Sequence, residues 1–242
     1  MAINTSYPVA VIVGVGPGLG FSVAKRFASE NFNVVLIARN KEQLQTLADE
    51  LNHTEEKAFV FLADMANQES IISAFEQVKQ KFKKIDVLIY NASSKFALKN
   101  ISELIPDDFM NSWKICCLGG LLSAQQVLPE MLKNNKGTII FTGATSAMRG
   151  NIGTAAFAAG KFSQRALAQS MARELGPKGI HVVHVIIDGQ IATPDVLQYF
   201  PNRPIESFLN PNKIAEVYWQ LYQQDKTVWT HEIDLRPAIE KF

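Results

Sequence analysis

A glycine-rich turn, GVGPGLG at residues 14–20, is the first stretch of this sequence that could bind a ligand. It lies between an apolar run that indicates a strand and the segment FSVAKRFASE, which has the pattern of a helix. Glycines let a backbone turn sharply and approach a ligand closely, and the first N–H groups of a helix are free to bind a pyrophosphate. A glycine motif alone is weak evidence, but its position between strand and helix predicts a phosphate-binding turn.

A second candidate is the segment FAAGK at residues 157–161, inside a predicted amphipathic helix. Phe157 and Lys161 are four residues apart, so on a helix both side chains lie on one face. The small residues between them favour close packing. A lysine one turn after a phenylalanine raises the question of whether position 157 lacks a polar group.

Short β-branched runs alternate with helical patterns along the chain, and these elements must position both candidates. Strands are predicted at 9–15, 33–38, 57–63, 86–91, 137–143 and 180–187, with a further one at 227–235. Helices are predicted near 18–30, 40–52, 67–82, 107–134, 154–175 and 211–224. Such alternation predicts βαβ units with right-handed crossovers. We therefore expect an α/β fold, a doubly wound (Rossmann) parallel sheet with helices on both faces, and a single domain over residues 1–242.

Composition and charge exclude several classes of function. Lys plus Arg total 24 against 23 Asp plus Glu, a net charge of +1 that predicts no nucleic-acid or membrane partner. The two cysteines are adjacent, so no disulfide framework is expected, which suits a cytoplasmic location. The histidines are not spaced as zinc ligands, so we expect no metal. The apolar run at 9–15 is too short to span a membrane and favours a buried strand.

The spacing of Gly14, Gly18 and Gly20, G-x-x-x-G-x-G, resembles that of the short-chain dehydrogenase/reductase family. Further segments keep the same register: DMAN (64–67), YNAS (90–93), FAAGK where the family has Y-x-x-x-K, and DGQIAT (188–193) in place of P-G-x-x-x-T. The resemblance covers residues 9 to about 195. It implies an NAD(P)-dependent oxidoreductase acting on a small carbonyl or alcohol. The implied cofactor-binding residues are Gly14, Gly16, Gly18, Leu19, Gly20, Arg39, Asp64, Met65, Asn91, Ala92, Lys161, Gly189, Ile191 and Thr193.

The active-site positions depart from the family's pattern. In the family, a Tyr exchanges a proton with the substrate oxygen, a Ser orients that oxygen, an Asn supports a proton relay and a Lys binds the nicotinamide ribose. Here the Tyr position is Phe157, the Ser position Ala144 and the Asn position Cys116. Lys161 is the catalytic residue that remains, and its ammonium can still hydrogen-bond ribose hydroxyls. The pattern resembles an atypical subgroup with Phe in place of the active-site Tyr.

Other side chains are candidates for the missing proton donor. Thr145 and Ser146 follow the Ser position, while Tyr90 and Asp188 are predicted to end strands that face the crevice. Each is more simply explained as a structural residue, the two hydroxyls as loop caps. Arg149 could meet an anionic substrate, although exposed arginines are usually solvated.

The residue type at the end of the second predicted strand bears on the choice of cofactor. An acidic side chain there would bind the ribose 2′-OH and repel a 2′-phosphate. This sequence has Ala38 followed by Arg39, whose guanidinium can bind a phosphate through two hydrogen bonds. We therefore expect NADP(H), with NAD(H) less favoured.

Two functions stay open on the sequence alone. The first is an oxidoreductase with an unidentified proton donor and an unknown small-molecule substrate. The second is a non-catalytic NADP-binding sensor or partner subunit, which would explain why Tyr, Ser and Asn are lost together. Family analogy also implies a homodimer or homotetramer built through the long helices. The proline-rich segment 193–211 is a candidate substrate lid or a surface excursion without a role.

Overall fold

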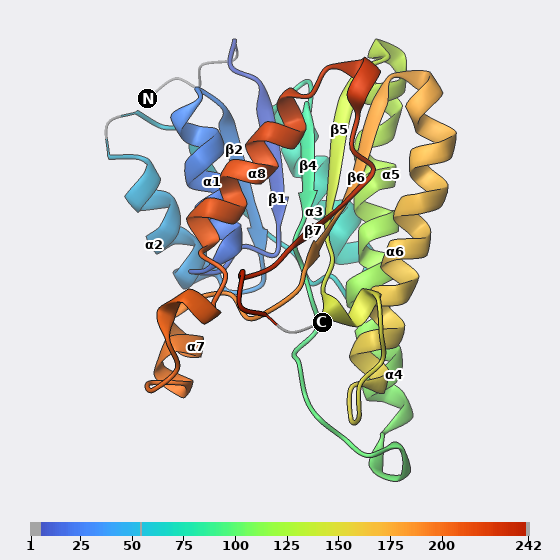
Figure 1. The fold of residues 1–242 in the computed structure, drawn as a ribbon. Helices are drawn as coiled ribbons and strands as arrows, with labels where there is room; N and C mark the ends of the chain where they lie inside the picture. Colours follow the sequence, from blue (N-terminus) through green and yellow to red (C-terminus); the bar gives the residue numbers. More distant parts are fainter. Residues whose placement is uncertain (1–5, 54, 241–242) are drawn as a thin grey trace.

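Seven strands form one parallel sheet in the computed structural model, which describes residues 6–53 and 55–240. They are β1 (Val9–Val13), β2 (Asn33–Ala38), β3 (Ala58–Leu62), β4 (Val87–Tyr90), β5 (Gly137–Thr142), β6 (Ile180–Ile187) and β7 (Glu232–Leu235). Their order is β3-β2-β1-β4-β5-β6-β7, so the chain runs from β1 to one edge and returns through β4 to the other (Figure 1). A doubly wound sheet forms its ligand crevice where this direction changes.

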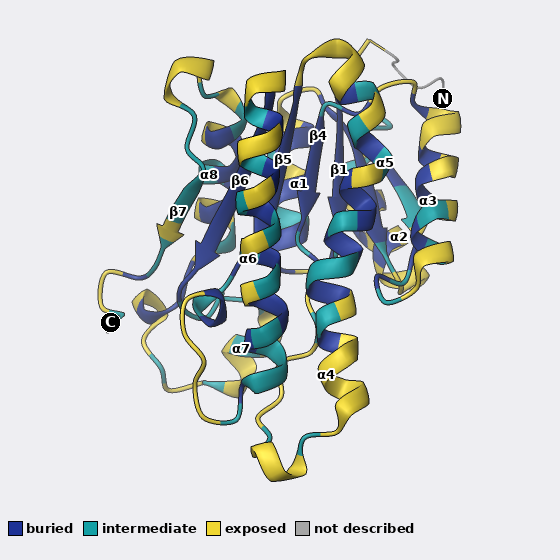
Figure 2. Cartoon of the chain, turned by 90° about the vertical axis from the view of Figure 1, so that its right-hand side faces the viewer, coloured by how far each residue is buried: buried dark blue, intermediate teal, exposed yellow. Residues whose placement is uncertain are grey.

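Helices cover both faces of the sheet and enclose two apolar cores (Figures 1 and 2). Helices α1 (Leu19–Ser29), α2 (Lys41–Leu51) and α8 (Pro211–Gln223) pack on one face, and α3 (Gln68–Lys81), α5 (Gly119–Asn134) and α6 (Ala155–Leu175) on the other. Two short helices, α4 (Pro106–Trp113) and α7 (Pro194–Tyr199), complete the set. Because helices cover both faces, β1 is a continuous apolar run and β6 is apolar except for His181 and His184.

The predicted fold class is confirmed, and β2 and β6 have the predicted bounds. The last strand is shorter than the predicted 227–235. It begins only at Glu232, because Lys226–Val228 forms a 3₁₀ turn. The Asp225 carboxylate caps this turn by accepting from the backbone N–H of Thr227. A local cap therefore outcompetes the strand pattern there.

The segment predicted as one helix over 107–134 is interrupted by a π-helical turn, Lys114–Leu118. A π turn frees carbonyls from the regular helical ladder, and side chains bind two of them here. The Tyr90 hydroxyl donates to the carbonyl of Ile115, and the Gln164 amide donates to the carbonyl of Cys116 (3.0 Å). Turns of this kind are frequent at functional sites.

By length and composition alone, the helical segment Pro106–Asn134 could cross a membrane. Its residues Leu122, Ala124, Val127 and Met131 are instead buried in the core beneath the sheet. A core helix meets the same length and composition criteria, and this packing is that of a core helix.

Candidate functional site

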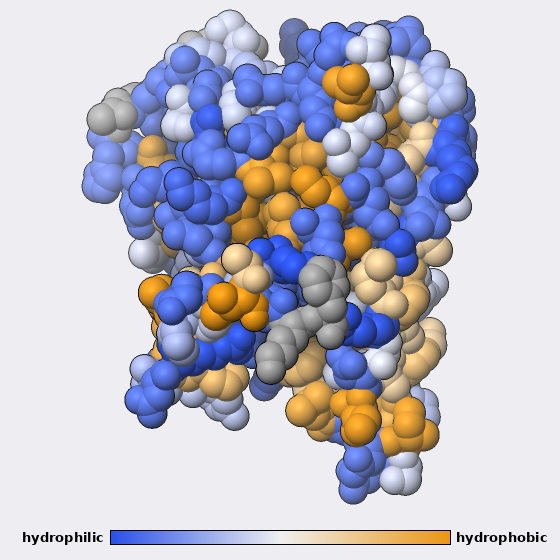
Figure 3. Space-filling view, in the orientation of Figure 1, coloured by the Kyte–Doolittle hydropathy of each residue, from blue (hydrophilic) through white to orange (hydrophobic). Residues whose placement is uncertain are grey.

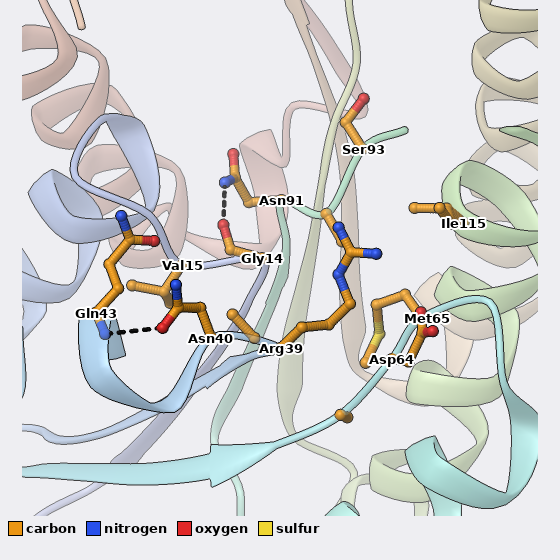
Figure 4. Close-up of a pocket in the computed structure, with 13 residues that line it drawn as sticks. Gly14, Val15, Arg39, Asn40, Gln43, Asp64, Met65, Asn91, Ser93 and Ile115 are labelled. Atoms are coloured by element: carbon orange, nitrogen blue, oxygen red, sulfur yellow. Dashed lines mark hydrogen bonds between the residues drawn. The ribbon is translucent and has the colours of Figure 1, made fainter. Parts of the chain in front are cut away.

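A cleft of about 390 Å³ opens where β1 to β4 end, at the predicted crevice (Figure 4). Some of its lining residues are among the predicted cofactor-binding residues: Gly14, Arg39, Asp64, Met65, Asn91 and Ala92. The others were not among the predicted cofactor-binding residues: Val15, Ala38, Asn40, Gln43, Ala63, Ser93 and Ile115. Most of these lie within a few residues of a strand end, which is the signal that could have found them.

The turn after β1 is held against the end of β4. Gly14 has a φ of +85°, in the left-handed region, and a Cβ there would lie 2.4 Å from the Cα of Ala92. The Asn91 side chain donates from Nδ2 to the carbonyl of Gly14 at 2.8 Å (Figure 4). Asn91 therefore braces the turn as well as lining the cleft.

Gly14→Ala is expected to destabilise the fold by about 2 kcal/mol or more, since it adds left-handed strain to a backbone clash. Gly16→Ala is the matched control, because a Cβ at Gly16 meets nothing within 4 Å and its φ is not in the left-handed region. Urea unfolding of the two variants checks this prediction. Equal loss of stability in both would show that the turn is not packed as described.

The remaining glycines of the turn allow it to pack closely against the loop that follows β6. A Cβ at Gly18 would lie 2.5 Å from Cγ2 of Thr193, so the turn lies against the loop after β6. Helix α1 begins at Leu19, and Gly20 packs closely on the carbonyl of Gly14. The residues Gly16, Gly18, Leu19, Gly20, Lys161, Gly189, Ile191 and Thr193 do not line the 390 Å³ cleft, and their binding role stays a prediction.

Arg39 follows β2 and is exposed, with its side chain extending into the cleft (Figure 4). Within the described residues it forms no ion pair, and no acidic residue ends β2. Its neighbour Asn40 caps α2 by accepting from the backbone N–H of Gln43 at 3.0 Å. Asp64 uses Oδ1 to accept from the backbone N–H of Ala66 at 3.0 Å, which fixes its side chain after β3.

Lys161 is buried, with only 2% of its surface exposed. Its ammonium donates to the carbonyl of Thr142 at 2.8 Å and lies 5.9 Å from the centre of the Phe157 ring. No acidic side chain of the described chain forms an ion pair with it. Desolvation by burial lowers the pKa of Lys161, opposed by the nearby Cys116 thiol.

The positions expected to carry catalytic hydroxyl and amide groups are occupied by packed side chains. Phe157 packs edge to face on Phe96, with ring centres 5.4 Å apart. Cys116 is buried in the π turn, its sulfur 3.7 Å from the hydroxyl of Ser94. Ala144 is half-buried at the end of β5.

Exposed apolar residues of two loops form what we call the apolar rim: Phe96, Leu98, Ile101, Met148 and Ile152. Of these, Phe96 packs on Phe157. The two loops that carry these residues are joined by the backbone N–H of Lys99, which donates to the carbonyl of Gly153 at 2.9 Å. Apolar side chains gather at the same end of the molecule in the space-filling view (Figure 3).

The interpretation of Tyr90 as a group facing the crevice is wrong. Its side chain is fully buried beneath α5, where the hydroxyl donates to the carbonyl of Ile115. The period of two along β4 directs residue 90 into the core, and burial raises its pKa well above the usual value. Tyr90 is therefore a core residue.

Asp188 is buried, and both of its carboxylate oxygens have partners. Oδ1 accepts from the Thr145 hydroxyl at 2.6 Å and lies 3.9 Å from the guanidinium of Arg149, while Oδ2 pairs with Arg236 at 2.9 Å. These contacts tie together three segments that follow strand ends. These contacts fit a structural role for Asp188, paired with two arginines, better than the role of an acid that donates a proton to a substrate. Ser146 is buried.

The segment 193–211 contains α7 and a 3₁₀ turn, Ile205–Ser207. Its two ends meet where Ile191 bridges Leu209, and Tyr199 and Ile205 are exposed. Its role as a lid stays a prediction.

In residues 6–53 and 55–240, no group of three or more His, Cys, Asp or Glu side chains could hold a metal ion.

Comparison with known proteins gave consistent matches over most of the chain. The family model "short chain dehydrogenase" matches residues 8–201. An uncharacterized oxidoreductase of Staphylococcus aureus (strain USA300) is 30% identical over 230 residues, covering 95% of this chain and 97% of the relative. A short-chain dehydrogenase structure from Rhodopseudomonas palustris is 36% identical, with a TM-score of 0.82 and coverage of 96% and 99%. An alcohol dehydrogenase from Thermococcus sibiricus, complexed with 5-hydroxy-NADP, shares the fold at 24% identity, with a TM-score of 0.85 and coverage of 97% and 98%.

Proposed function

Since the chain belongs to the short-chain dehydrogenase family, we propose that it is an NADP(H)-binding oxidoreductase of an atypical kind, with Phe in place of the active-site Tyr. The observation that carries the proposal is the cleft at the ends of β1 to β4, with Arg39 extending into it. Its substrate class is a small carbonyl compound or the corresponding alcohol.

The residues of the cleft fit a dinucleotide. The Gly14 turn admits close approach of a pyrophosphate, and Asp64 and Met65 provide a wall for an adenine. Arg39 has no acidic partner in the described chain, so its guanidinium is available to a 2′-phosphate. The NADP analogue in the Thermococcus sibiricus structure supports this choice by analogy only.

NADPH supplies a hydride when it is bound. The role of Lys161 would be to exchange the carbonyl of Thr142 for ribose hydroxyls and so hold the nicotinamide end. Neither Phe157 nor Ala144 has a proton to place on the substrate oxygen. A positioned acid contributes about 10²–10⁴ in rate, so we propose a slow reductase whose donor is another group. The apolar rim supports an apolar carbonyl substrate.

The second candidate function is a non-catalytic NADP-binding sensor or partner subunit. It is favoured by the way the replaced positions pack, since Phe157 packs edge to face on Phe96 and Cys116 is buried. A panel of aldehydes, ketones and enones with NADPH separates the two candidates. Turnover by the parent protein that is lost in the Lys161→Met variant would support the oxidoreductase function.

A titration of the purified protein with NADPH and, separately, with NADH tests the shared premise of both functions. We expect micromolar affinity for NADPH and at least about tenfold weaker affinity for NADH. Lys161→Met should weaken both cofactors, because both carry the nicotinamide ribose. The exposed Lys133, changed to Met, is the control and should weaken neither. Failure of both cofactors to bind would contradict the proposal.

A further inference from the structure

A chain of three side chains, of which His184 is fully buried and Arg165 and Glu232 are half-buried, lies near Lys161 and has no part in the function proposed above. Arg165 of α6 forms two hydrogen bonds, both of 2.7 Å, with the carboxylate of Glu232 on β7. The same carboxylate is 3.0 Å from Nδ1 of His184 on β6. In the sheet register His184 is opposite Glu232, so both side chains lie on the same face of the sheet. Helix α6 covers this face (Figure 2).

The contact with Glu232 determines which nitrogen of His184 carries the proton. A carboxylate paired with a guanidinium can only accept hydrogen bonds, so Nδ1 of the neutral imidazole must donate. Nε2 is then an acceptor with a free lone pair. Burial is the main cause that lowers the pKa of His184 to about 4, so the ring is neutral at pH 7.

Nε2 of His184 has no hydrogen-bond partner in the described part of the chain, although the side chain is fully buried. It lies against Gly143, where a Cβ would be 2.4 Å from Nε2. The preceding carbonyl, that of Thr142, accepts from the ammonium of Lys161. The imidazole acceptor and the ammonium therefore contact the same peptide unit, and a buried acceptor without a partner is costly.

Helix α6 directs the lysine and the arginine toward this point. Phe157, Lys161 and Arg165 are spaced by four residues and share one face of the helix. Lys161 contributes a positive charge at His184, and Cys116 is the other titratable group facing Lys161, from the π turn. The titratable groups around this pair are thus Cys116 beside Lys161, and Glu232 and Arg165 beside His184.

We propose that His184 is a positioning residue for Lys161, with Nε2 accepting a proton of the ammonium through a bridging water while Glu232 and Arg165 hold the imidazole in place. This inference rests on the proposed role of Lys161 toward the cofactor. A neutral acceptor stabilises the charged ammonium in a site that has no acidic partner for it. This hydrogen bond would oppose the lowering of the Lys161 pKa that burial causes.

The titration of Lys161 itself, followed by ¹³C NMR of labelled lysine in the apo protein, tests this coupling. Its signal is identified by its loss in Lys161→Met. His184→Leu should lower the midpoint of Lys161 by about one to two pH units, the shift expected for loss of a hydrogen bond to a charged group. His184→Gln, which can place an amide oxygen near the position of Nε2, should recover part of the shift.

His181→Leu is the matched control. His181 is on the same strand and is equally buried, but it stacks on Trp229 on the other face of the sheet. It should leave the midpoint of Lys161 unchanged. An unchanged midpoint in His184→Leu, or an equal shift in both variants, would overturn the proposal.

A second measurement needs only the parent protein. Nitrogen NMR of the imidazoles should show His184 neutral at pH 7, with the proton on Nδ1. A proton on Nε2 would overturn the proposal, whatever the stability of the variants. The pH dependence of NADPH affinity should shift with the midpoint of Lys161. A protein that binds no NADPH but keeps the coupling would contradict the proposed function and leave this inference standing.

Discussion

Phe157→Tyr combined with Ala144→Ser is expected to raise the rate of NADPH-dependent carbonyl reduction by about 10²–10⁴-fold, the usual contribution of a positioned acid. The new phenol would share a helix face with Lys161, whose ammonium lies 5.9 Å from the centre of the Phe157 ring. An ammonium at that distance stabilises a phenolate and so makes the phenol a better acid. The new serine hydroxyl would orient the substrate oxygen. The measurement is kcat/KM over a panel of apolar aldehydes and ketones.

Two controls separate this gain from a change in packing. Ala144→Ser alone adds a hydroxyl without an acid and should gain little. The double variant with Lys161→Met added should lose most of the gain, because the phenol no longer has its cationic neighbour. If the double variant binds NADPH as well as the parent and still shows no gain, then position 157 does not face the reacting oxygen. The Phe96 ring, packed on Phe157, would then be the first obstacle to remove.

The fold could be predicted because the sequence pattern within each strand and helix is enough to identify it. Strands covered on both faces must be mostly apolar, and β2 and β6 are so apart from Asn33, His181 and His184. The π turn at Lys114–Leu118 could not be predicted, because one extra residue barely disturbs a helical pattern. Its partners, the hydroxyl of Tyr90 and the amide of Gln164, come from other elements.

The residues of the candidate site also divide into those that the sequence predicts and those that it does not. The residues that follow strands, such as Gly14 and Arg39, could be placed at the crevice because parallel strands end at one edge of the sheet. The burial of Lys161 could not, since it depends on the carbonyl of Thr142 on another element. His184 and Glu232 are 48 residues apart in sequence, and no spacing rule connects them. Loss of a motif residue is visible in a sequence, whereas a group that compensates for it is visible only in three dimensions.

Arg39→Ala is expected to weaken NADPH binding by about 10- to 100-fold and to leave NADH binding almost unchanged. A hydrogen bond to a charged group contributes about 1.5–3 kcal/mol, and each 1.4 kcal/mol corresponds to a factor of ten in affinity. Only NADPH carries the 2′-phosphate that Arg39 would bind, so the loss should fall on that cofactor. Arg39 has no ion pair within the described residues, so its removal leaves no carboxylate without a partner.

The exposed Arg173 on α6, changed to Ala, is the control for the loss of one surface charge, since its guanidinium donates to the nearby carbonyl of Gln169 and to no carboxylate of residues 6–53 and 55–240. Calorimetric titrations of both cofactors at two salt concentrations make the comparison. The parent's advantage for NADPH should shrink at high salt, because Arg39 is exposed and its attraction for a phosphate is screened. If Arg39→Ala weakened the binding of NADPH and NADH equally, the guanidinium would contact a group that both cofactors share. The preference for NADP(H) would then have to come from elsewhere in the cleft, where Asn40 and Gln43 are the remaining polar side chains beside the end of β2.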